Sequence, residues 1–262
     1  MNLNLSGITL AGESNIGRRR TVNEDNFLVY APAGSRHAFA LAADGISGHV
    51  QGHTASTLCC RIALQKLRTL PEDKWDAALL KDIFAAINGE LFKYNFRERR
   101  QNTMGTALCA AIFSPDKVIV ANVGDCRFYE FSPGTVEPLR QISRDHRPDE
   151  HFFSRLNCPD EVRRKYRSML LRSLGPVNKV AVDIFEVKRT PGCSYLLCSD
   201  GLHSMVNDAA ISAFMATAVT ARELTGKLVR AALINGGTDN ITVVSALPET
   251  SPAGECKTIN IS

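Results

Sequence analysis

The stretch "TALCAAIFSPDKVIVANVGDCRFYEF" (residues 106–131) decides the fold class, because it holds three short apolar runs separated by turns of only a few residues. The runs 106–113, 117–124 and 126–131 are rich in β-branched and aromatic residues, which is typical of strands. The turns "SPDK" and "GDC" are too short for the crossover that parallel strands require. The stretch therefore predicts three consecutive antiparallel strands arranged as a meander.

The rest of the chain supplies further strands and four helices. Strand-like composition recurs at 26–31, 37–43, 180–187, 194–199 and 240–246. Helical periodicity marks 53–70, 74–100, 207–218 and 221–237. Strands and helices do not alternate one by one, which disfavours a doubly wound parallel sheet. The order predicts an α+β fold with helices packed outside antiparallel sheets.

Composition indicates an ordinary folded protein. The chain has 262 residues, 44% hydrophobic and 22% charged, with no Pro/Ser/Gly-rich linker. We expect a single domain over residues 1–248 and a flexible C-terminal tail over 249–262. The net charge of +4 is modest and its basic residues are spread out, so no nucleic-acid partner is expected. The start of the chain lacks a leader pattern and no stretch could span a bilayer, so we expect a cytoplasmic protein without a membrane partner.

Eight cysteines show no paired C-x-x-C spacing, which disfavours a zinc site. Most of them lie in apolar runs, where a free thiol behaves as a small hydrophobic group. They are Cys59, Cys60, Cys109, Cys126, Cys158, Cys193, Cys198 and Cys256.

Acidic residues recur where the predicted strands begin or end. They are Glu24, Asp25, Asp44, Asp125, Asp145, Asp200 and Asp239. Any one of them alone is typical of a turn or a helix cap. Strands of shared sheets bring several such ends to one edge, where two carboxylates 4 Å apart repel by about 4 kcal/mol at an effective dielectric of 20. A cation must therefore lie among them.

Oxygen ligands without His or Cys at metal spacing favour Mg²⁺ or Mn²⁺. A carboxylate shared by two such ions gives a site that lowers the pKa of a bridging water toward ~7 and serves the hydrolysis of phosphate esters. Arg20, four residues before Glu24, is the candidate for gripping the phosphoryl oxygens.

Eight motifs in order from Arg20 to Thr242 resemble those of the metal-dependent serine/threonine protein phosphatases of type 2C. Arg20 with Glu24-Asp25 resembles R-x-x-x-E-D. The others are "DGISGH", "TMGTAL", "VGDCR", "RDH", "LRSLG", "SDGL" and "TDNIT". The resemblance implies a four-layer αββα sandwich of two antiparallel sheets flanked by helix pairs, with a dinuclear metal centre at one edge.

The resemblance also implies residue roles. Asp44 would bridge two Mn²⁺ or Mg²⁺ ions, and the Gly45 carbonyl would complete one shell. Asp200 and Asp239 would bind the other ion, while Glu24 and Asp25 would hold metals or their waters. Asp125 would share a third, weaker ion with Asp200. The catalytic set is then Arg20, Asp44, Asp200 and Asp239.

The implied function is hydrolysis of phosphoserine and phosphothreonine in proteins by direct attack of metal-bound hydroxide. The compact length resembles stand-alone bacterial members that reverse a Ser/Thr kinase. The alternative is a non-catalytic member of the fold that binds phosphoproteins or acts as a scaffold. A magnesium-dependent nucleotide-binding enzyme is disfavoured, because the chain has no G-x-x-x-x-G-K-[ST] loop.

The motifs depart from the family pattern in places. Ile46 occupies the position after the D-G pair where several relatives have a His proposed as the general acid, so the acid stays unassigned. The segment 147–169, which matches the substrate-facing flap, lacks the usual His-Pro before R-x-L-G. His146 has a structural or a chemical role, and His49 and His53 are either satisfied loop or helix-start residues or functional ones.

Overall fold

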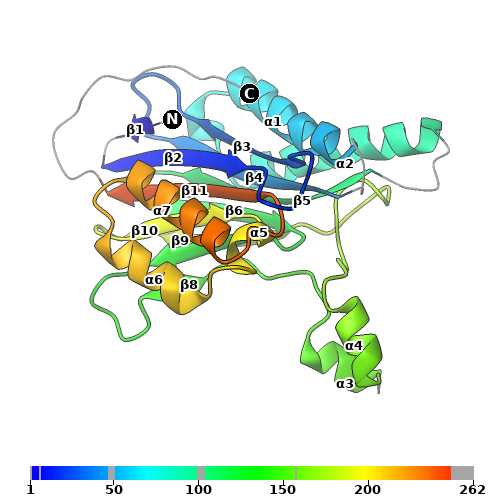
Figure 1. The fold of residues 1–262 in the computed structure, drawn as a ribbon. Helices are drawn as coiled ribbons and strands as arrows, with labels where there is room; N and C mark the ends of the chain where they lie inside the picture. The colour runs from blue at the N-terminus through cyan, green and yellow to red at the C-terminus, as the bar shows by residue number, and fades with distance from the viewer. Residues whose placement is uncertain (1, 6, 47–50, 99–103, 157, 249–262) are drawn as a thin grey trace.

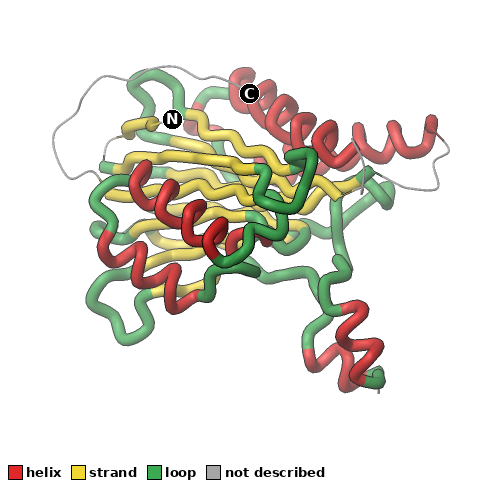
Figure 2. Tube along the Cα trace, viewed as in Figure 1, coloured by secondary structure: helices red, strands yellow, loops and turns green. Residues whose placement is uncertain are grey.

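The structure, a computed structural model, describes residues 2–5, 7–46, 51–98, 104–156 and 158–248. Two antiparallel sheets lie face to face at its centre (Figures 1 and 2). In order, the first sheet contains β1 (Asn2–Leu5), β2 (Ile8–Asn15), β11 (Ile241–Pro248), β10 (Ser194–Cys198), β7 (Arg127–Phe131) and β8 (Leu139–Gln141). The second contains β3 (Asp25–Tyr30), β4 (Ala38–Ile46), β5 (Gly105–Phe113), β6 (Lys117–Val123) and β9 (Asp183–Lys188).

Helices cover both outer faces (Figure 1). Apolar residues of α1 (Gln51–Thr69) and α2 (Ala77–Glu98), which follows a short 3₁₀ turn (Glu72–Lys74), pack on the second sheet. Those of α6 (Asp208–Thr217) and α7 (Ala221–Ile234) pack on the first sheet together with the short α5 (Asp200–His203). The predicted four-layer αββα sandwich is therefore confirmed.

The core between the sheets pairs small side chains with large ones. β4 and β5 present a row of alanines toward the other sheet, because alternate residues of a strand share one face. Phe128 on β7 and Tyr195 on β10 fill the space opposite and form a cluster of three rings with Phe113 of β5, at centroid distances of 6.3, 5.7 and 5.8 Å. This complementary packing fixes the separation of the two sheets.

The predicted meander is only half correct. β5 and β6 form the expected hairpin, but β7 leaves for the other sheet, where it pairs with β10 and β8. The chain turns at Gly124, which has a φ of +104° and whose added Cβ would lie 2.4 Å from the Ala107 Cβ. The turn that looked like a hairpin is thus a crossing between sheets. It carries Asp125.

Some elements were not predicted from the sequence. β2 pairs with β11 in the middle of the first sheet, although its sequence "ITLAGESN" mixes apolar and polar residues. Two short helices, α3 (Glu150–Arg155) and α4 (Asp160–Tyr166), project from the body of the molecule within the predicted flap (Figure 1).

The last described strand ends at Pro248, and the tail predicted over 249–262 lies outside the described residues. The single-domain assignment stays a prediction. Among the described helices, none combines the length and the hydropathy needed to cross a bilayer.

Phe128→Ala tests the packing between the sheets. We expect the free energy of unfolding to fall by about 3–5 kcal/mol, because the change leaves a cavity next to Phe113 and Tyr195. Urea denaturation followed by fluorescence measures the loss. Val136→Ala is the control, since Val136 is fully exposed and its change should be neutral. A loss below 1 kcal/mol in Phe128→Ala would contradict the described packing.

Candidate metal centre

Asp25 and Asp44 face each other across two neighbouring strands. The antiparallel register of β3 and β4 makes their Cα atoms partners, so the two side chains share one face of the sheet. Asp25 is 4% exposed, whereas Asp44 opens onto a cleft. Two acids 19 residues apart in sequence are thus held as neighbours by strand pairing alone.

Glu24 lies where the end of β4 meets the first turn of α1. Its carbonyl accepts a hydrogen bond from the Gly45 N–H, and its Oε1 accepts one from the Gly52 N–H, both at 3.2 Å. A Cβ at Gly45 would lie 2.1 Å from the Gly52 carbonyl oxygen, so only glycine permits this approach. The D-G pair of the sequence is therefore a packing requirement that keeps Glu24 beside the acid that precedes Gly45.

The first sheet contributes Asp200 and Asp239 from the ends of β10 and β11. Ser199 is the residue just before α5, and Asp200 is the first residue of that helix. The Ser199 hydroxyl donates to Asp25 Oδ2 at 2.6 Å and accepts from the Thr242 N–H at 2.9 Å. This one hydroxyl links an acid of the second sheet to two strands of the first. Sequence reasoning gave this hydroxyl no role, although Ser199 is the first residue of the "SDGL" motif.

Asn240 holds the loop that carries Arg20. Its Oδ1 accepts from the Glu24 N–H at 2.8 Å, and its Nδ2 donates to two carbonyl oxygens of the loop 16–22 at 2.9 and 3.0 Å. The loop is thereby placed so that Arg20 Nη2 reaches Asp239 Oδ2 at 2.8 Å. Asn240, the Asn of the "TDNIT" motif, thus joins the loop 16–22 and Glu24 by hydrogen bonds to the segment that carries Asp239.

The predicted ligands come together in one cleft of about 430 Å³. Five carboxylates line it: Glu24, Asp44, Asp125, Asp200 and Asp239. The Gly45 backbone and the guanidinium groups of Arg20 and Arg147 also line it, and Asp25 lies buried behind its wall. All eight site residues predicted from the sequence lie in this cleft or directly behind its wall. Arg147, which also lines it, was given no role by sequence reasoning.

One acid of the sequence series lies elsewhere. Asp145 accepts three hydrogen bonds from Arg127, at 2.8 to 3.1 Å, and a fourth from Gln141. Asp145 therefore forms a structural ion pair with Arg127 that fixes the segment after β8, and Asp145 is not part of the cleft.

The electrostatics of the cleft favour a cation. Burial, with a further contribution from Asp200, raises the pKa of Asp25 to about 7 and that of Asp125 to about 6. Burial and the neighbouring carboxylates also raise the pKa of Asp44 well above its ordinary value. Five carboxylates face only two guanidinium groups, so the site lacks positive charge.

The donor set fits hard divalent ions, because the lining offers carboxylate and carbonyl oxygens without sulfur. Within the described part of the chain, no three His, Cys, Asp or Glu side chains are drawn together as a preformed metal cage. The reason is visible in their partners. Asp25 bonds to Ser199, Asp239 to Arg20, and both Asp125 and Asp200 to Arg147. The acids are gathered in one cleft but turned toward protein groups.

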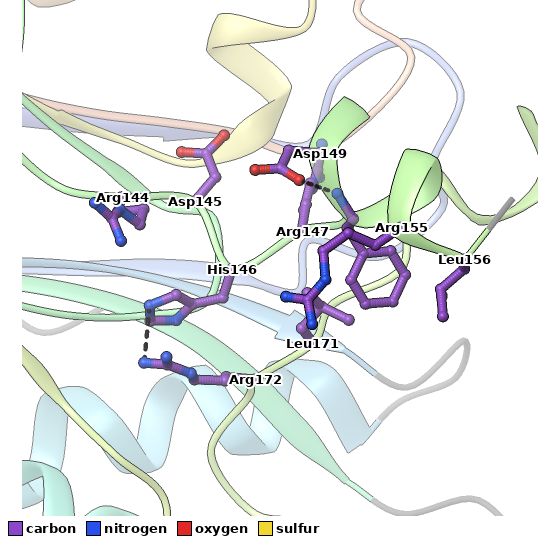
Figure 3. A pocket seen from close by; sticks show the side chains of 10 residues that line it. Arg144, Asp145, His146, Arg147, Asp149, Arg155, Leu156, Leu171 and Arg172 are labelled. Carbon is purple, nitrogen blue, oxygen red and sulfur yellow. Dashed lines mark hydrogen bonds between the residues drawn. The ribbon is translucent and has the colours of Figure 1, made fainter. Parts of the chain in front are cut away.

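His146 has a structural role. It is 5% exposed, its Nδ1 accepts from the Gly124 N–H at 3.0 Å, and its Nε2 faces Asp183 Oδ2 at 3.1 Å. The first bond places the proton on Nε2, which then donates to Asp183. Figure 3 shows the ring turned toward Arg172 at the base of a neighbouring pocket. His146 thus supports the Gly124 turn that presents Asp125.

No histidine is found among the described residues that line the cleft. Ile46 lies at its edge, 37% exposed, where it offers no proton. His53 Nδ1 pairs with the Asn23 carbonyl at 3.0 Å, in keeping with a satisfied helix-start residue, and His49 lies outside the described residues.

Asp44→Asn tests whether the cleft is a cation site. In the metal-free wild type, burial and the neighbouring carboxylates disfavour the charged form of Asp44, so the variant should melt higher, by roughly 2–4 °C for each kcal/mol of repulsion and burial cost that is relieved. Saturating Mn²⁺ should raise the melting temperature of the wild type and have much less effect on the variant. Glu137→Gln, an exposed acid, is the control. Equal Mn²⁺ shifts in all three proteins would refute the site.

Known proteins resemble this chain over most of its length. A family model described as protein phosphatase 2C matches residues 11–234. The serine/threonine phosphatase stp of Listeria innocua is 33% identical over 233 residues, which are 87% of this chain and 91% of that protein. The crystal structure of the Mycobacterium tuberculosis serine/threonine phosphatase PstP/Ppp matches with a TM-score of 0.77 and 30% identity, covering 92% of this chain and 98% of that one.

A second solved structure, the catalytic domain of PstP in complex with two manganese ions, matches with a TM-score of 0.74 and 29% identity, covering 92% of this chain and 98% of that one. The family match, the identity and the coverage agree with the cleft described above. The chain belongs to the protein phosphatase 2C family.

Proposed function

We propose that the protein is a metal-dependent phosphatase that hydrolyses phosphoserine and phosphothreonine in other proteins. The convergence of five carboxylates from both sheets on one cleft beside Arg20 carries the proposal. The names of the relatives as serine/threonine phosphatases support the substrate, and the manganese ions of the PstP structure support the metal. The alternative of a non-catalytic scaffold is not supported, because five of the six predicted acidic ligands line the cleft and the sixth, Asp25, lies buried opposite Asp44.

We assign the metal-binding roles by position in the cleft. Asp44, Asp200 and Asp239 would hold two Mn²⁺ or Mg²⁺ ions, with Glu24 and the Gly45 carbonyl beside them. Asp25, buried behind the wall of the cleft, would hold a metal ion or its bound water. Asp125 and Asp200 would together bind a third ion. When bound, a pair of such ions lowers the pKa of a water between them and so supplies the nucleophile at neutral pH.

Arg20 would hold the phosphoryl group of the substrate. Its side chain is 46% exposed at the mouth of the cleft and pairs with Asp239. A guanidinium fork can donate to two phosphoryl oxygens at once, and this interaction strengthens as negative charge develops on them. Asn240 acts indirectly, since it fixes the loop on which Arg20 is mounted.

The thiols do not compete for the role of nucleophile. The seven cysteines within the described part of the chain are unpaired, and six of them are buried. Cys126, near the acids, has a pKa raised well above its ordinary value by burial, so its thiolate is disfavoured. Water is therefore the attacking group in this proposal, and no phosphorylated enzyme forms.

Free thiols are also typical of a reducing compartment, which supports a location in the cytoplasm. A serine/threonine kinase whose products this enzyme would hydrolyse is the expected functional counterpart. The relatives named as a serine/threonine phosphatase and a protein phosphatase support a counterpart of this kind.

A phosphothreonine peptide tests the proposed activity. We expect phosphate release with Mn²⁺ or Mg²⁺, none in excess EDTA after dialysis, and a loss of at least 10³-fold in kcat for Asp239→Asn. Malachite-green detection measures the product, and Glu137→Gln should keep wild-type activity. Full activity of the dialysed protein in EDTA would overturn the proposal.

Arg20→Ala tests the phosphate grip separately from metal binding. The expected result is a fall in kcat/KM of about 10²-fold with nearly unchanged Mn²⁺ affinity, because Arg20 meets charge that develops on the substrate. Arg19→Ala, its exposed neighbour, is the matched control. An unaltered kcat/KM in Arg20→Ala would show that the residue is only part of the surface.

A further inference from the structure

Arg147 stands in the cleft where a cation is expected. Its Nη2 donates to Asp200 Oδ2 at 2.6 Å and forms an ion pair with Asp125 Oδ2. The same nitrogen therefore lies between the two carboxylates that the proposed function assigns to a third ion. A guanidinium and a divalent cation cannot both occupy this position, since both need the same oxygen atoms.

The pairing is incomplete by comparison with a structural arginine close by. Arg127 donates to Asp145 through Nε and Nη2 and to the Tyr129 hydroxyl through Nη1, so its fork is filled. Arg147 uses Nη2 for both carboxylates, and its Nε is buried without a hydrogen-bond partner among the described residues. The Arg147 guanidinium is therefore held by charge attraction through one nitrogen, and not by paired hydrogen bonds from two of its nitrogens.

Arg147 also has open space beside it outside the metal cleft. It lines the metal cleft and two adjoining pockets at once, one of about 490 Å³ shown in Figure 3. Asp149 lines both adjoining pockets and offers a carboxylate outside the cleft. A change of side-chain rotamer would move the guanidinium from one set of acids toward another without moving the backbone.

We propose that Arg147 is a built-in counter-ion, which neutralises Asp125 and Asp200 in the metal-free protein and competes with the divalent cation that this pair binds. The inference rests on the proposed function for the identity of the ligands. It adds that uptake of the third ion displaces an arginine, so this site fills only at metal concentrations high enough to outcompete it. Of the three acids assigned to the first two ions, only Asp200 is paired with Arg147, so the competition falls mainly on the third ion, both of whose acids Arg147 contacts.

Mn²⁺ binding to EDTA-stripped protein, measured by electron paramagnetic resonance of the free ion, tests the inference. Arg147→Gln should tighten the weakest site about tenfold or more, because the competing charge is gone. It should also lower the melting temperature of the metal-free protein, because Asp125 and Asp200 lose their partner. Arg144→Gln removes the same charge from an exposed residue of the same segment and is the matched control.

Unchanged Mn²⁺ affinity in Arg147→Gln, or equal tightening in Arg144→Gln, would overturn the inference while leaving the proposed function intact. Absence of Mn²⁺ binding in the wild type would instead overturn the proposed function. If Arg147→Gln does not fold without metal, arginine side-chain ¹⁵N NMR of the wild type decides. Mg²⁺ should shift the Arg147 Nε signal, assigned by its loss in Arg147→Lys, and leave that of Arg127 in place; an unmoved Arg147 signal at saturating Mg²⁺ contradicts displacement.

Discussion

Repulsion among carboxylates is the constraint on which the functional half of this molecule depends. Strand pairing fixes Asp25 opposite Asp44, and the ends of β10 and β11 bring two more acids to the same edge. Asp25 and Asp44 cannot move apart without breaking the pairing of β3 with β4, and the two sheets cannot separate without opening the core between them. The repulsion is therefore met by partners: a hydroxyl for Asp25, an arginine for Asp239 and another for Asp125 with Asp200.

The motif residues divide into acids that line the metal cleft and residues that hold the surrounding segments in position. Acidic residues face the cleft, whereas Gly45, Asn240 and Thr106 make the approach of separate segments possible. Thr106 shows this well, because its hydroxyl bonds to the Asp44 carbonyl at 2.9 Å while its backbone pairs with Leu174. A motif residue next to an acid thus stabilises its position without touching a ligand.

The sequence predicted antiparallel sheets with outer helices, and the acids, because both leave local signals: apolar runs, short turns, and carboxylates at strand ends. The arrangement in four layers came from the resemblance to a known family. The sequence did not predict that β7 changes sheets, since a three-residue turn at Gly124 serves a hairpin or a crossing equally well. It also gave no role to Ser199 or Arg147. Their partners lie 174, 53 and 22 residues away in the chain, so their contacts exist only after the fold has brought distant segments together.

The alanine rows of β4 and β5 act as a spacer for chemistry at the sheet edge. Because methyl groups make up much of this wall of the inter-sheet core, Phe128 and Tyr195 of the other sheet, together with Phe113 of β5, fill the space between the sheets and set their separation. The acids of the cleft are mounted on both sheets, so this spacing is also the distance between opposing ligands. A larger side chain in the alanine rows would overfill the inter-sheet core and, by pushing the sheets apart, would also separate the acids that they carry.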